Sequence, residues 1–290
     1  MYNNGAELLS LVNQRQASIA SVVMEKECKL SGLSREEVRK KMKTNLDVML
    51  ASAEYALEHD IKSVGGIIGG DAKKMESYRK QRSTICGETV NRVMARAFST
   101  SEVNASMGRV CAAPTAGASG IIPATIITVA ESLGASEDTM IDALFTASGV
   151  GDIIAKNATL SGAEGGCQAE CGAAAAMAAA AIVEMAGGTA EMSLQAAATA
   201  LKNIMGLICD PIAGLVEAPC AKRNASGAVN AMLSADLALA GVKSIIPFDE
   251  VVEAMYKVGK SLPFELRETA LGGIASTETG IRIKKEIFGE

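Results

Sequence analysis

The sequence predicts a compact all-α domain in which glycine-rich loops gather around one site. Hydrophobic residues make up 49% of the 290 residues, whereas aromatic residues make up 3% and tryptophan is absent. A core of alanine, valine, isoleucine, leucine and methionine favours helices, because sheets depend on β-branched and aromatic side chains. The β-branched stretches, such as IIPATIIT and KSIIPF, are short, and no regular hairpin pattern is found. No stretch is typical of a linker or a repeat, so residues 1–290 are expected to form one domain.

Helices are predicted in order along the first hundred residues. One is expected over about 6–29. Ser34 and Glu37 match the S-x-x-E capping box, and the charged segment after them is expected to stay helical to about His59. A further helix is expected over 88–105. Because this region is richer in charge than the rest, residues 1–100 are expected to form an outer helical layer.

The later helices are predicted from N-cap residues and from alanine content. Helices are expected to begin near Ser119, at Ser136 and at Thr189, with the last of these ending near residue 203. The alanine-rich segment 168–185 gives the strongest helix prediction of the chain. A final helix is expected over about 249–259.

Charge and hydropathy exclude several classes of protein. The net charge is −5, and no basic run with interleaved aromatic residues suggests nucleic-acid binding. The N-terminus lacks a positively charged segment followed by an apolar one, so no signal peptide is expected and a cytoplasmic location is predicted. The uncharged stretch 110–130 is long enough to span a membrane, but its prolines, glycines and hydroxyl residues argue against a span.

Glycine-rich turns and cysteines occur together in the middle of the chain. The turns are SVGGIIGGDAKK (63–74), PTAGASG (114–120), SGAEGG (161–166) and LGG (271–273). The turn at 114–120 precedes a helix with Pro123 in its first turn, so its backbone N–H groups could bind a carboxylate or a phosphate. The pattern matches neither a P-loop nor GxGxxG, and a tight turn between packed helices explains it equally well.

The seven cysteines are expected to be reduced thiols, because no secretory signal accompanies them. Cys167 and Cys171 lie four residues apart, which suits metal ligands, a redox pair or two small packed side chains. Cys209 and Cys220 lie close to prolines, so both are expected on loops or helix ends. No CxxC pair favours zinc, whereas an iron–sulfur cluster tolerates wide spacing. Spacing alone favours packed thiols over a metal site.

The single histidine, His59, is expected on the surface at the end of a charged helix. A Ser-His or Cys-His nucleophilic pair is therefore disfavoured, and one chain cannot supply a three-histidine zinc site. Any catalytic base is expected to be a Lys, Glu, Asp or Cys of this chain, or to come from a partner chain.

Four segments resemble one known family. They are APTAGASGIIPA (113–124), KNATLSGAEGGCQAECG (156–172), CDPIAGLVEAPCAKRNA (209–225) and MYKVGKSLPFELRETALGGIA (255–275). With GGDAKKM (69–75), they closely resemble the α chain of the iron–sulfur-dependent, PLP-independent L-serine dehydratases. The resemblance implies an all-helical fold and a [4Fe–4S] cluster held by Cys167, Cys209 and Cys220. It implies no role for Cys171, which is expected to pack as a small apolar residue.

The resemblance also implies the chemistry. An iron without a protein ligand would act as a Lewis acid on the hydroxyl of L-serine, and a base would take the α-proton. The product would hydrolyse to pyruvate and ammonia in amino-acid degradation and gluconeogenesis, without PLP. We expect the substrate carboxylate to be bound by the turn and the helix after Cys220, through Thr115, Ala116, Gly117, Ser119, Lys222, Arg223 or Asn224. The candidates for the base are Lys156, Glu164 and Lys222.

The family also implies a partner. A histidine-containing part of these enzymes is absent from this sequence, so we expect a β subunit and a hetero-oligomer. A related L-cysteine desulfidase is the alternative enzyme, because an open iron would also bind a thiol. A non-enzymatic, alanine-rich helical scaffold with merely packed cysteines is the distant alternative, and a PLP-dependent lyase is disfavoured for want of a Schiff-base lysine context.

Overall fold

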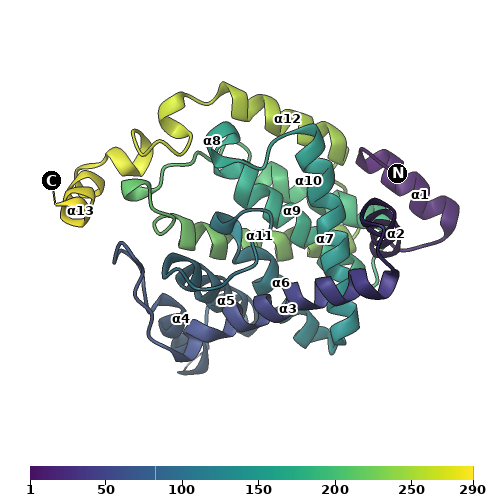
Figure 1. The fold of residues 1–290 in the computed structure, drawn as a ribbon, viewed down its shortest axis with the longest axis horizontal. Helices are drawn as coiled ribbons and strands as arrows, with labels where there is room; N and C mark the ends of the chain where they lie inside the picture. The colour runs from purple at the N-terminus through teal and green to yellow at the C-terminus, as the bar shows by residue number, and fades with distance from the viewer. Residues whose placement is uncertain (82, 290) are drawn as a thin grey trace.

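The computed structural model describes residues 1–81 and 83–289. Within these residues no strand forms, and the all-α prediction is confirmed (Figure 1). The helices in chain order are α1 (Gly5–Arg15), α2 (Ile19–Ser31), α3 (Arg35–Glu58), α4 (Asp71–Gln81), α5 (Gly87–Ala105), α6 (Ile121–Leu133), α7 (Glu137–Asn157), α8 (Gly162–Gly165), α9 (Ala173–Met185), α10 (Ala190–Asn203), α11 (Cys220–Leu239), α12 (Phe248–Ser261) and α13 (Glu278–Phe288).

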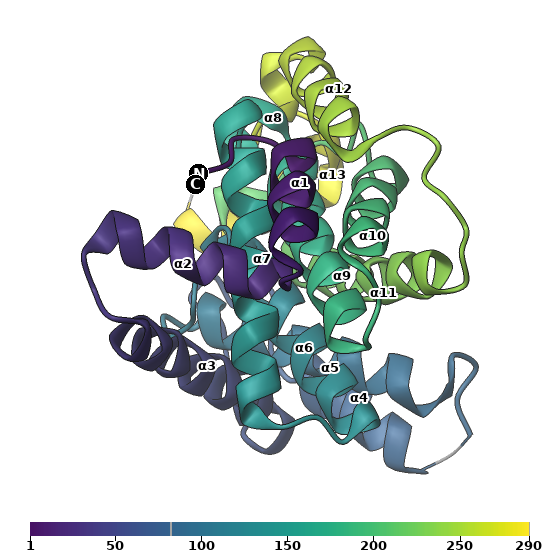
Figure 2. The same ribbon diagram turned by 90° about the vertical axis from the view of Figure 1, so that its right-hand side faces the viewer.

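The alanine-rich helix α9 lies at the centre of the fold. Every residue from Ala173 to Val183 is buried. Helices α6, α7, α10 and α11 pack against it, and Figures 1 and 2 show α9 enclosed by these helices. Methyl side chains let the neighbouring helices approach closely, because they add little bulk between the backbones. The alanine run therefore allows four helices to pack closely around α9.

Several predicted helix starts are confirmed by their caps. Ser34 forms the complete capping box with Glu37 at the start of α3. Ser136 accepts a hydrogen bond from the Thr139 N–H at the start of α7, and Thr189 caps α10 in the same way. The side-chain oxygens satisfy N–H groups that the first helical turn leaves free.

The single helix expected over 6–29 is wrong, because the chain forms α1 and α2 with a break between them. Gln16 ends α1 in the left-handed conformation, with φ of 48°, and Ser18 caps α2. Both helices place side chains in the core, including Leu8 and Ile19, and α5 adds Val93. Helix α3 crosses on the outside of α5 and α7 (Figure 2).

One helical stretch in the described residues, Ala116–Leu133, is long and apolar enough to cross a membrane by length and composition. It comprises a short 3-10 turn and α6, and 67% of it is buried inside the fold. It packs against α5, α9 and α11, as a core helix does.

Candidate functional site

Three buried or half-buried cysteines come from three separate segments. Cys167 precedes a π-helical turn, Gln168–Gly172, that leads into α9. Cys209 lies between α10 and α11, and Cys220 is the first residue of α11. As expected, both of these residues occupy a loop or a helix end.

The three thiols are close enough to affect one another's ionisation. Burial raises the pKa of Cys220 to about 12, with further contributions from Cys167 and Glu170. Burial likewise raises the pKa of Cys209 far above its usual range, and Cys167, Glu170 and Cys220 add to the effect. Thiols so arranged favour the protonated form unless a nearby cation compensates the thiolate charge.

Cys171 contacts Cys167 directly. Their Sγ atoms lie 3.4 Å apart, and both side chains are buried. The contact lowers the pKa of Cys167 and raises that of Cys171, so the proton stays on Cys171. Cys171 is thus packed against Cys167 inside the core, as expected for a small buried side chain.

An ion pair fixes the segment that carries Cys209. Arg223 donates to the Asp210 carboxylate at 2.8 Å and to the Ile208 carbonyl at 2.9 Å. The other oxygen of Asp210 accepts the Ile274 N–H at 2.7 Å, and a Cβ on Gly273 would lie 2.2 Å from it. Asp210 is 1% exposed, so this buried pair ties α11, the Cys209 loop and the C-terminal segment together.

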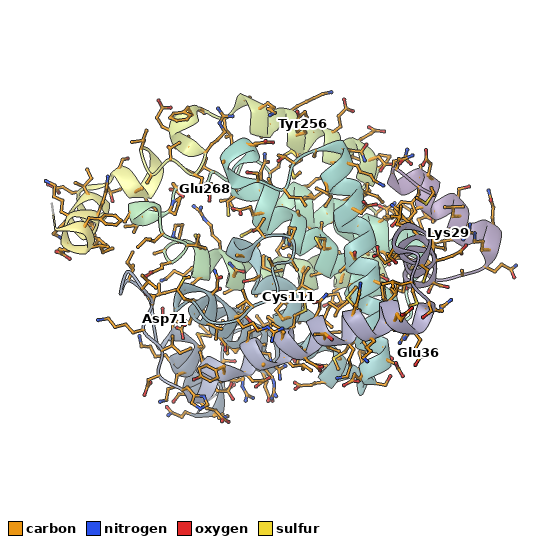
Figure 3. The ribbon with its side chains drawn as sticks, in the orientation of Figure 1. Lys29, Glu36, Asp71, Cys111, Tyr256 and Glu268 are labelled. Carbon is orange, nitrogen blue, oxygen red and sulfur yellow. The ribbon has the colours of Figure 1, made fainter. Side chains whose placement is uncertain are left out.

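The C-terminal segment also pairs with the backbone of Cys209. The Cys209 N–H donates to the Leu266 carbonyl at 2.9 Å, and the Glu268 N–H donates to the Cys209 carbonyl at 2.7 Å. This isolated parallel bridge sets Cys209 opposite Arg267. Glu268, labelled in Figure 3, and Ala270 both have positive φ, at 63° and 56°. Such strain persists where surrounding contacts over-determine the backbone, as they often do at functional sites.

Asn224 holds the small-residue turn against α11. Its Oδ1 accepts the Gly120 N–H at 2.9 Å. Its Nδ2 donates to the carbonyls of Gly117 and Cys220 at 2.7 and 2.9 Å. Within the turn, Thr115 Oγ1 accepts the Ala118 N–H. The structure thus brings the predicted turn beside Cys220, with Asn224 fully used in positioning it.

Glu170 is a site residue that sequence reasoning missed. Its Oε2 lies 3.9 Å from the Cys209 Sγ, and burial raises its pKa against a hydrogen bond from Thr115. A Cβ on Gly162 would lie 2.6 Å from the same oxygen and 3.1 Å from the Cys209 Sγ. The only available signal was its place in the CQAEC segment, one residue before Cys171.

Glu217 is a second missed residue, and it connects the glycine-rich turn 63–74 to the cysteine loop. Its buried carboxylate accepts the Ser63 hydroxyl at 2.5 Å and the N–H groups of Gly65 and Ile67 at 2.6 and 3.0 Å. The turn therefore packs near Cys220 through a residue of the segment that also carries Cys209 and Cys220.

The three candidate bases are held by other groups or exposed to solvent. Lys156 donates to Asp152 at 3.1 Å and to the Tyr2 carbonyl at 3.4 Å, at the end of α7. Glu164 and Lys222 are exposed on α8 and on the first turn of α11. No hydrogen bond in the described residues joins any of the three to a cysteine.

The described residues present no ready site for a single metal ion. In the described residues, no group of three or more His, Cys, Asp and Glu side chains is arranged to hold one metal ion. A cluster needs only that its cysteines converge in space, and each thiolate binds a different iron. Cys167, Cys209 and Cys220, which influence one another's pKa, are the thiols that such a cluster would use.

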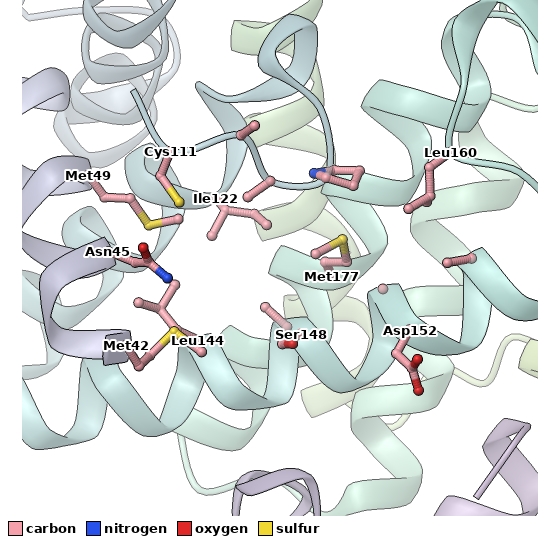
Figure 4. Close-up of a pocket in the computed structure, with 16 residues that line it drawn as sticks. Met42, Asn45, Met49, Cys111, Ile122, Leu144, Ser148, Asp152, Leu160 and Met177 are labelled. Atoms are coloured by element: carbon pink, nitrogen blue, oxygen red, sulfur yellow. The ribbon is translucent and has the colours of Figure 1, made fainter. Parts of the chain in front are cut away.

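A separate cavity of about 360 Å³ lies between α3 and α7 (Figure 4). Its walls are mainly apolar and include Met42, Met49, Leu144 and Met177. Residues 111–114, just before the small-residue turn, close one side, but none of the three converging cysteines lines it.

Comparisons with known proteins agree on one family. The sequence model of the family described as "Serine dehydratase alpha chain" matches residues 14–275. The chain is 48% identical to the "Probable L-serine dehydratase, alpha chain" of Bacillus subtilis, over all of this chain and 96% of that protein. It is 50% identical to the "L-serine dehydratase, alpha chain" of Peptoniphilus asaccharolyticus, over all of this chain and 99% of that protein. The "L-serine dehydratase" of Streptomyces coelicolor is 34% identical over 94% of this chain and 60% of its own length.

Proposed function

Because this chain belongs to the serine dehydratase alpha-chain family, we propose that it is the α subunit of an iron–sulfur L-serine dehydratase. The reaction is the conversion of L-serine to pyruvate and ammonia. The observation that supports the proposal is that Cys167, Cys209 and Cys220, in a chain of this family, lie close enough to influence one another's pKa.

In this proposal these three cysteines hold a [4Fe–4S] cluster. When bound, such a cluster with one iron free of protein ligands supplies a Lewis acid for departure of the serine hydroxyl. The Asp210–Arg223 pair and the bridge to Arg267 keep Cys209 in place, and burial keeps bulk water away from the thiols. No PLP is required.

The small-residue turn has a binding role in the proposal. In the proposal, the turn that contains Thr115, Ala116, Gly117 and Ser119 borders the substrate, and Asn224 holds this turn beside Cys220. The α-proton of serine must pass to a base. Lys156, Glu164 and Lys222 make no hydrogen bond to a cysteine in the described residues, so the partner chain is the better source of that base.

A β subunit and a cytoplasmic location complete the proposal. The full-length relatives are named as alpha chains, which supports a second chain. His59 stacks on Tyr55 and is exposed, so it has no part in the cysteine site. A histidine needed for the reaction would come from the partner. Reduced thiols and an exposed iron both suit a reducing compartment.

The test is anaerobic iron and sulfide analysis of the wild type and of Cys167→Ser, Cys209→Ser and Cys220→Ser. We expect about four irons per chain in the wild type, and loss of iron in each variant. Cys171→Ser and the exposed Cys86→Ser are the matched controls and should keep the wild-type iron content. Pyruvate formation from L-serine, L-cysteine and L-threonine with the β chain then identifies the substrate. Absence of iron after anaerobic reconstitution would contradict the proposal.

A further inference from the structure

Two charged side chains near Cys209 have no partner of opposite charge. The Arg267 Nε is buried without a hydrogen-bond partner, and no ion pair to this guanidinium occurs in the described residues. The Glu170 side chain is largely buried, its hydrogen-bond partners are Thr115 and the Cys209 thiol, and the nearby charge is the like-charged Glu268. Buried charges in proteins are normally paired. Both groups are therefore suited to a charged ligand.

Both groups are positioned around the same residue. In the parallel bridge Arg267 lies directly opposite Cys209, and side chains of directly paired residues leave the backbone on the same face. Glu170 reaches the Cys209 thiol from the π-helical turn, with 3.9 Å between Oε2 and Sγ. No ion pair joins Glu170 to Arg267 in the described part of the chain. Arg267 is thus paired with Cys209 through the backbone, and Glu170 contacts the Cys209 thiol.

The other polar residues expected to bind substrate are already engaged. The Arg223 guanidinium is committed to Asp210 and to the Ile208 carbonyl. The Asn224 amide is committed to three backbone groups. Lys222 is exposed on the first turn of α11. Arg267 is consequently the guanidinium near the thiols whose hydrogen-bonding capacity remains available.

We infer that Arg267 and Glu170 form a split clamp for the zwitterion of an α-amino acid. The Arg267 guanidinium receives the α-carboxylate, with a planar fork that matches two carboxylate oxygens. The Glu170 carboxylate receives the α-ammonium group. The inference rests on the proposed function and deepens it, because it states how L-serine is oriented with its hydroxyl directed to the thiols.

The test uses three ligands that differ in one charged group. L-Serine carries both groups, 3-hydroxypropionate lacks the ammonium group, and ethanolamine lacks the carboxylate. Their binding to the anaerobically reconstituted holoenzyme is measured by calorimetry and by competition with L-serine turnover. Iron and sulfide contents are determined first for the wild type, Arg267→Gln and Glu170→Gln.

The clamp predicts a crossed pattern. Arg267→Gln should weaken L-serine and 3-hydroxypropionate at least about tenfold, which corresponds to about 1.4 kcal/mol, and leave ethanolamine unchanged. Glu170→Gln should weaken L-serine and ethanolamine by a similar factor and leave 3-hydroxypropionate unchanged. Equal losses for all three ligands would mean a structural role, and unchanged binding would mean no role; either result overturns the clamp.

Matched controls come from nearby exposed charges. Arg282→Gln on α13 and Glu265→Gln beside the bridge should leave all three affinities at wild-type values. If a glutamine variant loses its iron, Arg267→Lys and Glu170→Asp keep the charge and shift its position. The clamp would be overturned if, in those variants, the affinity for L-serine relative to 3-hydroxypropionate and relative to ethanolamine stayed at the wild-type value. A wild-type holoenzyme that does not turn over L-serine would instead contradict the proposed function.

Discussion

Gly162 is the residue that lets Glu170 and Cys209 approach each other. A Cβ at this position would lie 2.6 Å from Glu170 Oε2, closer than real Cβ contacts allow, and 3.1 Å from the Cys209 Sγ, a tight contact. Gly117 faces the same carboxylate from the other side, but a Cβ there would lie 3.4 Å from Oε1, in ordinary contact. The two glycines therefore form a matched pair for testing how tightly the site is packed.

We predict that Gly162→Ala loses most of its iron after anaerobic reconstitution, because the added methyl displaces Glu170 and the Cys209 thiol. Gly117→Ala should retain at least about half of the wild-type iron content, since its methyl meets only ordinary contacts. Iron and sulfide analysis with circular dichroism checks both variants. Equal iron contents in the two variants would show that close packing at Gly162 does not matter to the site.

At the scale of one element, the alanine-rich helix α9 forms the centre of the fold. Eleven consecutive residues from Ala173 to Val183 are buried, so the helix has no face that can accept a larger side chain. Four other helices pack on it, one of them, α11, begins with Cys220, and Cys167 precedes the turn that leads into α9 itself. Its packing therefore bears on where Cys167 and Cys220 lie.

Ala178→Leu should lower the free energy of unfolding by about 1–3 kcal/mol or more, because three extra carbons have no space in a close-packed core. The matched change Ala51→Leu, at an exposed position of α3, should alter it by less than about 0.5 kcal/mol. Urea denaturation followed by circular dichroism measures both. A stable Ala178→Leu protein would mean that the helices around α9 can move apart.

Helix prediction from the sequence succeeded where caps or composition are decisive, as at Ser34 and along α9. It missed α4, α11 and α13. Helix α4 is highly charged and has few apolar residues, and α11 follows Pro219 and contains glycine, serine and asparagine in its first two turns. The break at Gln16 had no local signal, since a glutamine in the left-handed conformation is set by tertiary contacts.

At the cysteine site, too, the motifs could be predicted from the sequence, whereas contacts between distant residues could not. The resemblance identified the motifs, and the structure brings the three cysteines close enough to interact electrostatically; their role as cluster ligands stays a prediction. Spacing could not predict the contacts of Glu170, Asp210 or Glu217, because each side chain meets partners far away along the chain. Asp210, for example, pairs with Arg223 and also accepts the Ile274 N–H.

At the scale of the whole molecule, one buried arginine joins three helices. Arg96 on α5 is 1% exposed and contacts Glu54 of α3 at 2.6 Å and Glu131 of α6 at 2.5 Å. Burial alone would raise the pKa of Glu131, but the hydrogen bonds and charges of Arg96 and Arg92 outweigh it and hold this pKa below its usual value. Glu131 therefore stabilises the fold above the pKa it has in the unfolded chain, and this contribution is lost as the pH falls through the lower, folded-state pKa.

Arg96→Met should lower the free energy of unfolding by about 1–3 kcal/mol at pH 7, because it removes the hydrogen-bonded partner of two carboxylates that are only partly solvated. The loss should shrink as the pH falls through the lowered, folded-state pKa of Glu131. The exposed pair Arg282–Glu286 provides the control, and Arg282→Met should cost less than about 0.5 kcal/mol. Urea unfolding at several pH values measures both. A loss that did not depend on pH would assign the effect to packing rather than charge.

The bridge between Cys209 and the segment around Arg267 sets an order of events during biosynthesis. Translation must continue some sixty residues past Cys209 before the Leu266 carbonyl, the Glu268 N–H and the Ile274 N–H exist to hold that loop. A nascent chain that exposes all three cysteines therefore still lacks the brace that fixes one of them. If the three cysteines hold an iron–sulfur cluster, the Cys209 loop takes its final position only after this late segment has been synthesised, and insertion of the cluster would follow that step.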